Sequence, residues 1–376
     1  MTQAERPLIV REGRLFAYRV LDVADEFNLP AAEQLVQAAA ARRGALTREG
    51  ARSLVISAPP LEVPLGQYKV ALPRTQLLFD AEVSARLFEY GALSVCFEMS
   101  IAPGTELEAL VSFCDELYDS AELDRLAREL VPPLLARLGA ATKGRHEWDA
   151  IETYTVVFVT SFDGAPLASE VLASPTLASL VVGEPPNRRL SAGQRQDVLQ
   201  HAHSYLEDDL VVVDWNSAFV LEPSKSQDIP DILELATSQL LELRYYDGLF
   251  DAELARVYRE FDRVRGRGFA SGLVRNPWVE LGRGVIKRLV ELTELTDRVD
   301  NALKIIGDFY LARVYESAVR RFRIRAWQSS IDAKQAALAQ AYQLVRGEID
   351  ARRSTALELI IIVLIVFEVL LAVVRR

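Results

Sequence analysis

The stretch Leu359–Leu371, which reads LIIIVLIVFEVLL, constrains this chain more than any other part of its sequence. It lies in an apolar run of nineteen residues, Ala356 to Val374, which as a helix would be about 28 Å long. The hydrocarbon core of a bilayer is about 30 Å thick, and helices buried in soluble proteins are rarely apolar on every face. The run therefore predicts a membrane-spanning helix. The alternative is a buried C-terminal helix or the core of an oligomer.

Two glutamates in this run, Glu358 and Glu368, oppose its insertion into lipid. Its fifteen Leu, Ile, Val and Phe residues contribute about −4 to −9 kcal/mol, whereas one charge costs about 3 kcal/mol at the bilayer centre. The apolar contribution is larger, so insertion is expected. Glu358 should lie in interfacial water. Glu368 is expected to be tolerated near the far interface or to contact a partner helix, with proton chemistry as a remoter alternative.

Basic residues flank the apolar run on both sides. Arg375 and Arg376 follow it, and more basic residues lie within twenty positions before residue 354, where the anchor is predicted to begin: Lys334, Arg346, Arg352 and Arg353. This bias predicts that the bulk of the chain stays inside the cell. The first twenty residues lack the apolar core and small-residue cleavage site of a signal peptide. We therefore expect a single-pass tail anchor.

The rest of the chain predicts an α+β domain over residues 1–222. Alternating apolar residues predict strands, and apolar residues at helical spacing predict helices. The expected strands are 15–22, 53–63, 67–72, 76–79, 92–99, 153–162, 209–213 and 217–221, and the main expected helices are 30–43, 105–120, 121–138, 166–182 and 191–200. Neighbouring strands without regular strand–helix alternation are typical of α+β folds.

Residues 223–353 predict an all-α stalk, and residues 354–376 the membrane anchor. Two apolar registers have coiled-coil spacing: Leu292, Leu295, Val299, Ala302, Ile306 and Phe309, then Ile331, Leu338, Tyr342, Val345 and Ile349. A turn is expected at 327–332 and a flexible break at 265–272. A helical hairpin within one chain and an intermolecular coiled coil both remain open.

Three segments together resemble a known family. They are LFEYGALSVCFEM (87–99), LEDDLVVVDWNSAFVLEP (206–223) and ARRSTALELIIIVLIVFEVLL (351–371). The chain resembles the required-for-meiotic-nuclear-division family, a domain of unknown function in bacteria and mitochondria, and both Glu358 and Glu368 fall on its pattern. The resemblance implies a bacterial inner-membrane protein, and its mitochondrial members imply a role in tethering ribosomes. It supplies no catalytic residues.

Two groups of residues are candidate sites outside the apolar run. His201 and His203 have metal-binding character, but zinc needs three or four ligands and no others converge in the sequence. Two arginine-rich stretches are candidates for contact with lipid headgroups or RNA phosphates. The alternative is a solvated face that also pairs with the acidic N-terminal domain. They are Arg313, Arg320, Arg321, Arg323 and Arg325, and Arg256, Arg259, Arg263, Arg265 and Arg267.

The absence of recognisable catalytic or phosphate-loop motifs favours a binding protein over an enzyme. The net charge of −10 argues against nucleic-acid binding over the whole surface, though not against a local basic patch. We expect a membrane-tethered cytoplasmic scaffold without cofactors. It would contact the lipid bilayer and, through its helical region, a second copy or another protein. The alternatives are a ribosome- or RNA-tethering protein and a metal-dependent enzyme.

Overall fold

The computed structural model describes residues 7–36, 42–43, 54–56, 59–184, 187–265, 277–300, 303–305 and 309–374. The predicted fold class is confirmed: a mixed-sheet domain is followed by helices and a long, apolar C-terminal helix. The contacts divide the chain into two compact units, Met1–Arg244 with Arg298–Ala326, and Tyr245–Asp297 with Trp327–Arg376. The predicted borders at residues 222 and 353 differ from this division, because each unit combines two separate stretches of chain.

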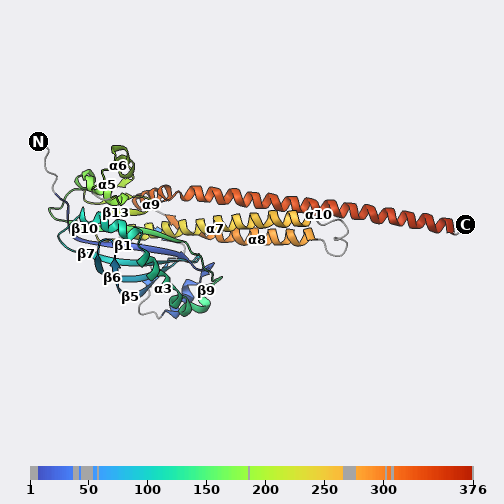
Figure 1. Ribbon diagram of the computed structural model, residues 1–376, viewed down its shortest axis with the longest axis horizontal. Helices are drawn as coiled ribbons and strands as arrows, with labels where there is room; N and C mark the ends of the chain where they lie inside the picture. Colours follow the sequence, from blue (N-terminus) through green and yellow to red (C-terminus); the bar gives the residue numbers. More distant parts are fainter. Residues whose placement is uncertain are drawn as a thin grey trace. The chain divides into compact units, whose positions relative to one another are not determined.

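The first unit is built on a mixed sheet, which has ten strands among the described residues (Figure 1). The strand order is β11 (Ala202–His203), β12 (Leu210–Val213), β13 (Ser217–Leu221), β10 (Ile151–Phe162), β1 (Ile9–Asp22), β7 (Ala92–Ile101), β6 (Leu77–Leu87), β5 (Leu61–Leu72) and β3 (Arg42–Arg43), with β8 (Thr105–Glu106) also paired to β1. Only the β10–β13 pair among these is parallel. Two short pairs complete the described strands, β2 (Glu26–Phe27) with β9 (Thr142–Lys143) and β4 (Leu54–Ile56) with β14 (Leu303–Ile305).

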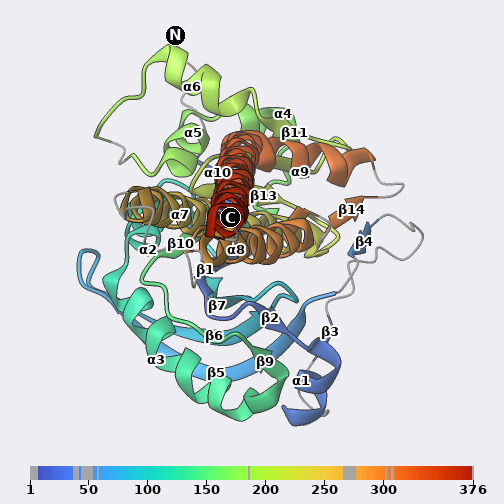
Figure 2. The ribbon, with the colours of Figure 1, turned by 90° about the vertical axis from the view of Figure 1, so that its right-hand side faces the viewer.

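Strand β1 is buried on both faces, as its apolar and aromatic sequence requires. Leu15 and Ala17 belong to the main apolar core, whereas Phe16 and Tyr18 are buried on the opposite face because successive side chains alternate. The core face is covered by helices α1 (Leu29–Leu35), α2 (Ala109–Tyr118), α3 (Ala121–Leu138), α4 (Ala168–Ala173), α5 (Pro175–Val182) and α6 (Ala192–Leu199). Figure 2 shows α3 beside β5.

The fully buried Arg19 of β1 fixes the corner between α2 and α3. Its guanidinium donates to the backbone carbonyl of Leu117 at 2.5 Å and to the carboxylate of Asp124 at 2.5 Å. Burial lowers the pKa of Arg19, and Asp124 opposes this effect. The last carbonyls of α2 have no partner within their helix, so the guanidinium satisfies groups that would otherwise be buried alone.

One strand prediction and one helix prediction are wrong. Residues 61–72 form one strand rather than two, because the register shift between Pro64 and Gly66 lets β5 continue past the proline. Arg42 and Arg43 pair with β5 as β3 instead of ending a helix, since α1 ends at Leu35. The intervening part of that predicted helix lies outside the described residues.

Four long helices follow: α7 (Asp228–Arg265), α8 (Pro277–Asp300), α9 (Phe309–Arg321) and α10 (Ile324–Val374). The turn predicted at 327–332 is wrong, because this stretch contains neither glycine nor proline and α10 runs through it. The chain breaks instead at Arg323, whose φ of +57° separates α9 from α10. The predicted flexible break at 265–272 lies outside the described residues except for Arg265, which ends α7.

In the second unit the ends of α7 and α8 lie beside α10 (Figure 1). Lys334 of α10 forms ion pairs with Asp247 at 2.8 Å and Asp251 at 2.7 Å, both on α7. Gly282 of α8 lies so close to α10 that a Cβ atom there would be 3.4 Å from Val345 Cγ1. We call these three packed segments the arm.

The second apolar register packs inside the arm, where Leu338 and Val345 are fully buried. This agrees with packing within one chain; the intermolecular coiled coil stays a prediction. The first register does not persist, because its last member, Phe309, opens the separate helix α9 and is 86% exposed. Its members Ala302 and Ile306 lie outside the described residues.

The close packing of Gly282 on α8 against α10 can be tested by substitution. Replacing Gly282 with Ala should leave stability equal or raise it by up to about 1 kcal/mol, because alanine favours helix and its Cβ makes ordinary contacts. Gly282→Leu should destabilise by about 1–3 kcal/mol through overpacking. Gly284→Leu is the control, since the nearest atom to its Cβ is the end of the Arg256 side chain at 3.9 Å. Thermal unfolding in detergent, followed by circular dichroism, measures the order; equal effects of both leucines would contradict it.

Candidate functional site

Helix α9 packs against β11 and β12 in the first unit and brings the histidine pair to the arginine stretch. Nε2 of His203 lies 2.6 Å from the hydroxyl of Ser317, although the two residues are 114 positions apart in sequence. Arg320 and Arg321 end the same helix. The structure thus unites two groups of residues that the sequence analysis singled out separately.

Arg321 is engaged in structural ion pairs rather than presented to solvent. Its guanidinium contacts Asp214 Oδ1 at 2.7 Å and Asp197 Oδ2 at 3.1 Å. Asp214 is almost fully buried; burial raises the pKa of its carboxyl, and the charge of Arg321 acts in the opposite direction. Arg321 therefore compensates a buried carboxylate, which makes it a poor candidate for binding an external phosphate.

The other arginines of this stretch are exposed. Arg325 pairs with Glu316 at 2.8 Å. In the described part of the chain, Arg313, Arg320 and Arg323 form no ion pair. These three guanidinium groups are the ones available to an anionic partner.

Both histidines lie in surroundings that disfavour a cation. Burial and the charges of Arg321 and Arg320 lower the pKa of His201. Burial and the charge of Arg313 lower the pKa of His203. The described residues contain no group of three or more His, Cys, Asp or Glu that could hold a metal ion. The neutral imidazoles could in principle be ligands, but three neighbouring arginines would repel a divalent ion.

Exposed aromatic and apolar side chains lie beside these arginines. Phe309 is 86% exposed and stands one turn before Arg313 on α9, while Tyr205 and Leu206 are also exposed. The ring of Tyr205 lies 5.8 Å from that of Tyr310. We call this group, together with Arg313 and Arg320, the α9 surface. Aromatic rings beside guanidinium groups are typical of protein interfaces and of surfaces that bind single-stranded nucleic acid.

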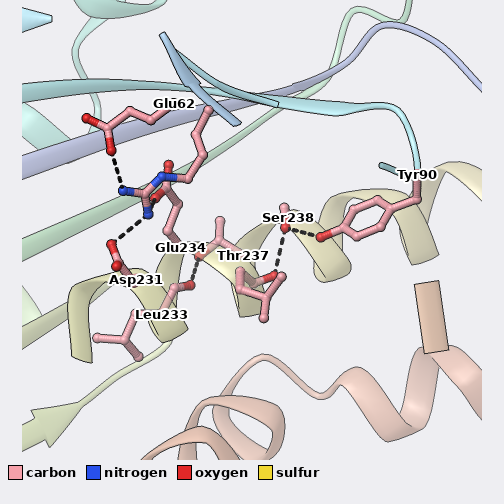
Figure 3. A network of polar contacts seen from close by, with 9 residues as sticks. Glu62, Tyr90, Asp231, Leu233, Glu234, Thr237 and Ser238 are labelled. Atoms are coloured by element: carbon pink, nitrogen blue, oxygen red, sulfur yellow. Dashed lines mark hydrogen bonds and ion pairs between the residues drawn. The ribbon is translucent and has the colours of Figure 1, made fainter. Parts of the chain in front are cut away.

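A buried ionic network joins α7 to the sheet in the same unit (Figure 3). Arg86 of β6 contacts Asp231 at 2.6 Å and Glu234 at 2.5 Å, both on α7, and Glu62 of the neighbouring strand β5 at 3.2 Å. Glu62 and Arg86 are register partners across β5 and β6. One guanidinium therefore forms ion pairs with three carboxylates.

Further along α7, hydrogen bonds connect the helix to the loop that contains Tyr90. The hydroxyls of Tyr90 and Ser238 lie 2.6 Å apart, and the Ser238 hydroxyl also donates to the carbonyl of Leu235 (Figure 3). Tyr90 is placed by Gly91, whose φ is +104° and whose Cβ, if present, would lie 1.7 Å from the carbonyl oxygen of Ala24. A side chain at position 91 would thus displace the loop that presents Tyr90 to α7.

Glu234 is the most perturbed carboxyl of this network. Its burial raises the pKa to about 7, with Arg86 acting in the opposite direction and Asp231 and Glu62 adding to the increase. Three carboxylates around one cation cannot all ionise cheaply in a buried site. The network therefore gains or loses a proton near neutral pH.

A cavity of about 500 Å³ opens elsewhere in the first unit. It lies between the start of α5 and the segment before α6, and three arginines and two glutamates line it: Arg188, Arg189, Arg195, Glu106 and Glu108. Arg188 pairs with Glu184 at 3.2 Å. The mixed charge of the lining gives no clear preference for one ligand.

The apolar run of α10 is exposed along its whole described length. Its large side chains from Leu357 to Val373 are between 45% and 68% exposed. Glu358 and Glu368 are exposed as well, while Arg375 and Arg376 lie outside the described residues. Among the described helices, α10 is the one long and apolar enough to cross a membrane, and none of its apolar window is buried.

Comparison with known proteins places the sheet of the first unit in a family. A family model described as "Uncharacterized protein MJ0711, N-terminal domain" matches residues 12–228. The chain belongs to the MJ0711 N-terminal domain family. The uncharacterized protein MJ0711 of Methanocaldococcus jannaschii is 26% identical over 190 residues, which cover 48% of this chain and 53% of that protein. The chain thus matches about half the length of this relative. No solved structure matches it.

Membership of the MJ0711 family overturns the resemblance to the required-for-meiotic-nuclear-division family, because the match covers the N-terminal domain and nothing points to the other family. That resemblance depended mainly on the glutamates of an apolar helix, a pattern that membrane helices can share by composition alone. The relative is archaeal, and a bacterial source stays a prediction. The match ends at residue 228, so helix α9 and most of α7 lie outside it, whereas Tyr205 and Leu206 of the α9 surface lie within it.

The sequence analysis missed the polar residues that face α7 and a second buried pair. His146 lies 2.9 Å from Asp22, which ends β1. Burial lowers the pKa of His146, but the hydrogen bond and charge of Asp22 outweigh it, so the pKa is raised. A carboxylate at the end of a strand was the available signal for Asp22. The alternation of Glu62, Arg86 and Ser94 with apolar neighbours was the signal for a polar second face.

The raised pKa of Glu234 predicts a pH dependence of stability. The folded carboxyl keeps its proton up to about pH 7, whereas an unfolded one releases it near pH 4.5. The free energy of unfolding should therefore fall by about 3 kcal/mol as pH rises through this window. Glu234→Gln should abolish that part of the decrease in denaturant unfolding at about pH 5 and about pH 8. Glu82→Gln, an exposed position on the same sheet, is the control; an unchanged slope in Glu234→Gln would refute the assignment.

Two neighbouring substitutions, Arg321→Met and Arg320→Met, test the structural role of Arg321. Arg321→Met should lower the free energy of unfolding by about 3 kcal/mol, because it leaves Asp214 buried without its cation. Arg320→Met, one residue earlier and exposed, should change it by less than about 0.5 kcal/mol. Urea unfolding of the detergent-solubilised chain measures both, and equal losses would contradict the structural role of Arg321.

Proposed function

We propose that this protein is a single-pass membrane protein that presents its α+β unit in the cytoplasm as a binding scaffold without chemistry of its own. One observation carries the proposal: the apolar run of α10 buries none of its large side chains in the protein. In water, an apolar surface of this length would exceed the few hundred Å² that soluble monomers expose. In the bilayer, lipid chains surround these apolar side chains and remove them from water.

The proposed orientation follows from charge. Arg346, Arg352 and Arg353 precede the apolar run, and positively charged residues next to a span are retained on the cytoplasmic side. The scaffold role is supported by the α9 surface, where exposed aromatic and basic side chains are available to a partner. A second copy of the chain and another protein remain alternative partners. A single membrane span at the apolar run and a bacterial inner membrane are predictions of the same proposal.

Removal of residues 355–376 tests the anchor. The full chain should stay with membranes after washing at alkaline pH, because its apolar side chains lie in lipid. The shortened chain should move to the soluble fraction with the circular dichroism of a folded protein. A full chain that is released by the wash, or a folded shortened chain that stays with membranes, would contradict the anchor. The substitution Glu368→Leu is the control, since it should keep the chain in the membrane.

A specific observation favours one second function, tethering of RNA or ribosomes. Phe309 and the exposed guanidinium groups of Arg313, Arg320 and Arg323 provide a stacking ring beside positive charge. Co-sedimentation with ribosomes at low salt, lost when these three arginines are changed to Glu, would support it. The triple change of Arg188, Arg189 and Arg195 to Glu at the cavity is the matched control. Absence of association at low salt would remove this function.

A further inference from the structure

The arm ends where the apolar run begins. Trp278, in the first turn of α8, packs against Phe261 of α7 with ring centroids 5.0 Å apart. The guanidinium of Arg352 on α10 lies 5.5 Å from the centroid of the Trp278 ring. Arg352 precedes the apolar run at Ala356 by four residues, or about 6 Å of helix. The contact therefore fixes the ends of α7 and α8 at the level where the run starts.

Charge is distributed unevenly along the arm. We call residues 259–265, 277–283 and 346–353 the arm tip. It contains seven arginines and five carboxylates, whereas the remainder of the arm before the run (245–258, 284–297 and 327–345) contains four basic and seven acidic residues. The tip is thus positive in a chain whose net charge is −10.

Several arginines of the tip have no ion-pair partner among the residues that the structure describes. Arg263 pairs with Glu260 and Arg352 with Glu348. The remaining five are exposed and form no ion pair with any residue in the described ranges: Arg259, Arg265, Arg283, Arg346 and Arg353. Exposed guanidinium groups at this level would lie in the headgroup layer, which is about 5–7 Å thick on each side of a bilayer.

We propose that the arm tip binds the anionic headgroups of the bilayer that the apolar run crosses. The end of α7 and the start of α8 would then contact the membrane surface. This inference depends on the membrane insertion proposed above. Two observations select lipid over other anions: the tip is continuous with the apolar run through the Trp278–Arg352 contact, and positive charge is concentrated there. Basic residues near an anionic membrane surface each add about 1 kcal/mol of attraction.

A fluorophore at the tip tests the proposal in the full chain reconstituted into liposomes. Asp262→Cys places the label at the exposed tip without removing an arginine, and Ala252→Cys is the control, about 15 Å further along α7. The native thiols Cys96 and Cys114 are free, so the labelled wild-type chain supplies the background. Lipids with a nitroxide on the headgroup quench only a label at the membrane surface.

In liposomes of phosphatidylcholine and phosphatidylglycerol, the label at position 262 should lose most of its fluorescence and the label at position 252 little. The quenching should fall in phosphatidylcholine alone and in the double variant R259E/R265E, but not in K287E/R288E away from the tip. Equal quenching at both positions in a chain that floats with the liposomes would overturn the proposal while leaving the anchor intact. Equal quenching in both lipid mixtures would overturn the binding of anionic headgroups. A chain that does not float would overturn the anchor itself.

Discussion

The guanidinium of Arg86 determines how the first half of α7 lies on the sheet. It contacts Glu62 on the neighbouring strand and Asp231 and Glu234 on the helix, so β5, β6 and α7 share one buried cation. Around it, Ile232, Leu233 and Leu235 are also buried, which leaves this part of α7 almost without a solvent-facing side. Removing one partner of such a group is costly because the others remain buried with unbalanced charge. The helix therefore has a single position on the sheet.

The arginines of this protein include a paired set and an exposed set, which have different roles. In the first unit, Arg86, Arg19 and Arg321 are buried or half-buried and neutralise carboxylates or cap backbone groups. The exposed arginines lie elsewhere, on the α9 surface and at the arm tip. Because a cation that is already paired contributes little to binding an external anion, the proposed partner and lipid contacts depend on this second set.

Much of the fold could be predicted from local pattern. The alternation in β1 and β10 and the helical spacing in α2 and α3 gave the right elements, because each has one face in the main core. The errors arose where a neighbour overrides the local signal. Pro64 does not end the strand, because a bulge at Leu65 of β5 shifts its register with β6 and the pairing continues from Gly66. A turn was expected at 327–332, yet α10 continues there because nothing in the stretch breaks a helix.

The sequence by itself determined the apolar run of α10, since nineteen residues without a polar face need lipid or an apolar partner in any fold. It also indicated the sheet domain and the arginine-rich stretches. Only the tertiary structure decided which arginines are free, that His203 meets Ser317, and that Glu234 shares Arg86 with two other acids. The contacts of His203 with Ser317 and of Arg86 with α7 join residues more than one hundred positions apart. The physical reason is that charge compensation and burial depend on distance in space, which no local pattern contains.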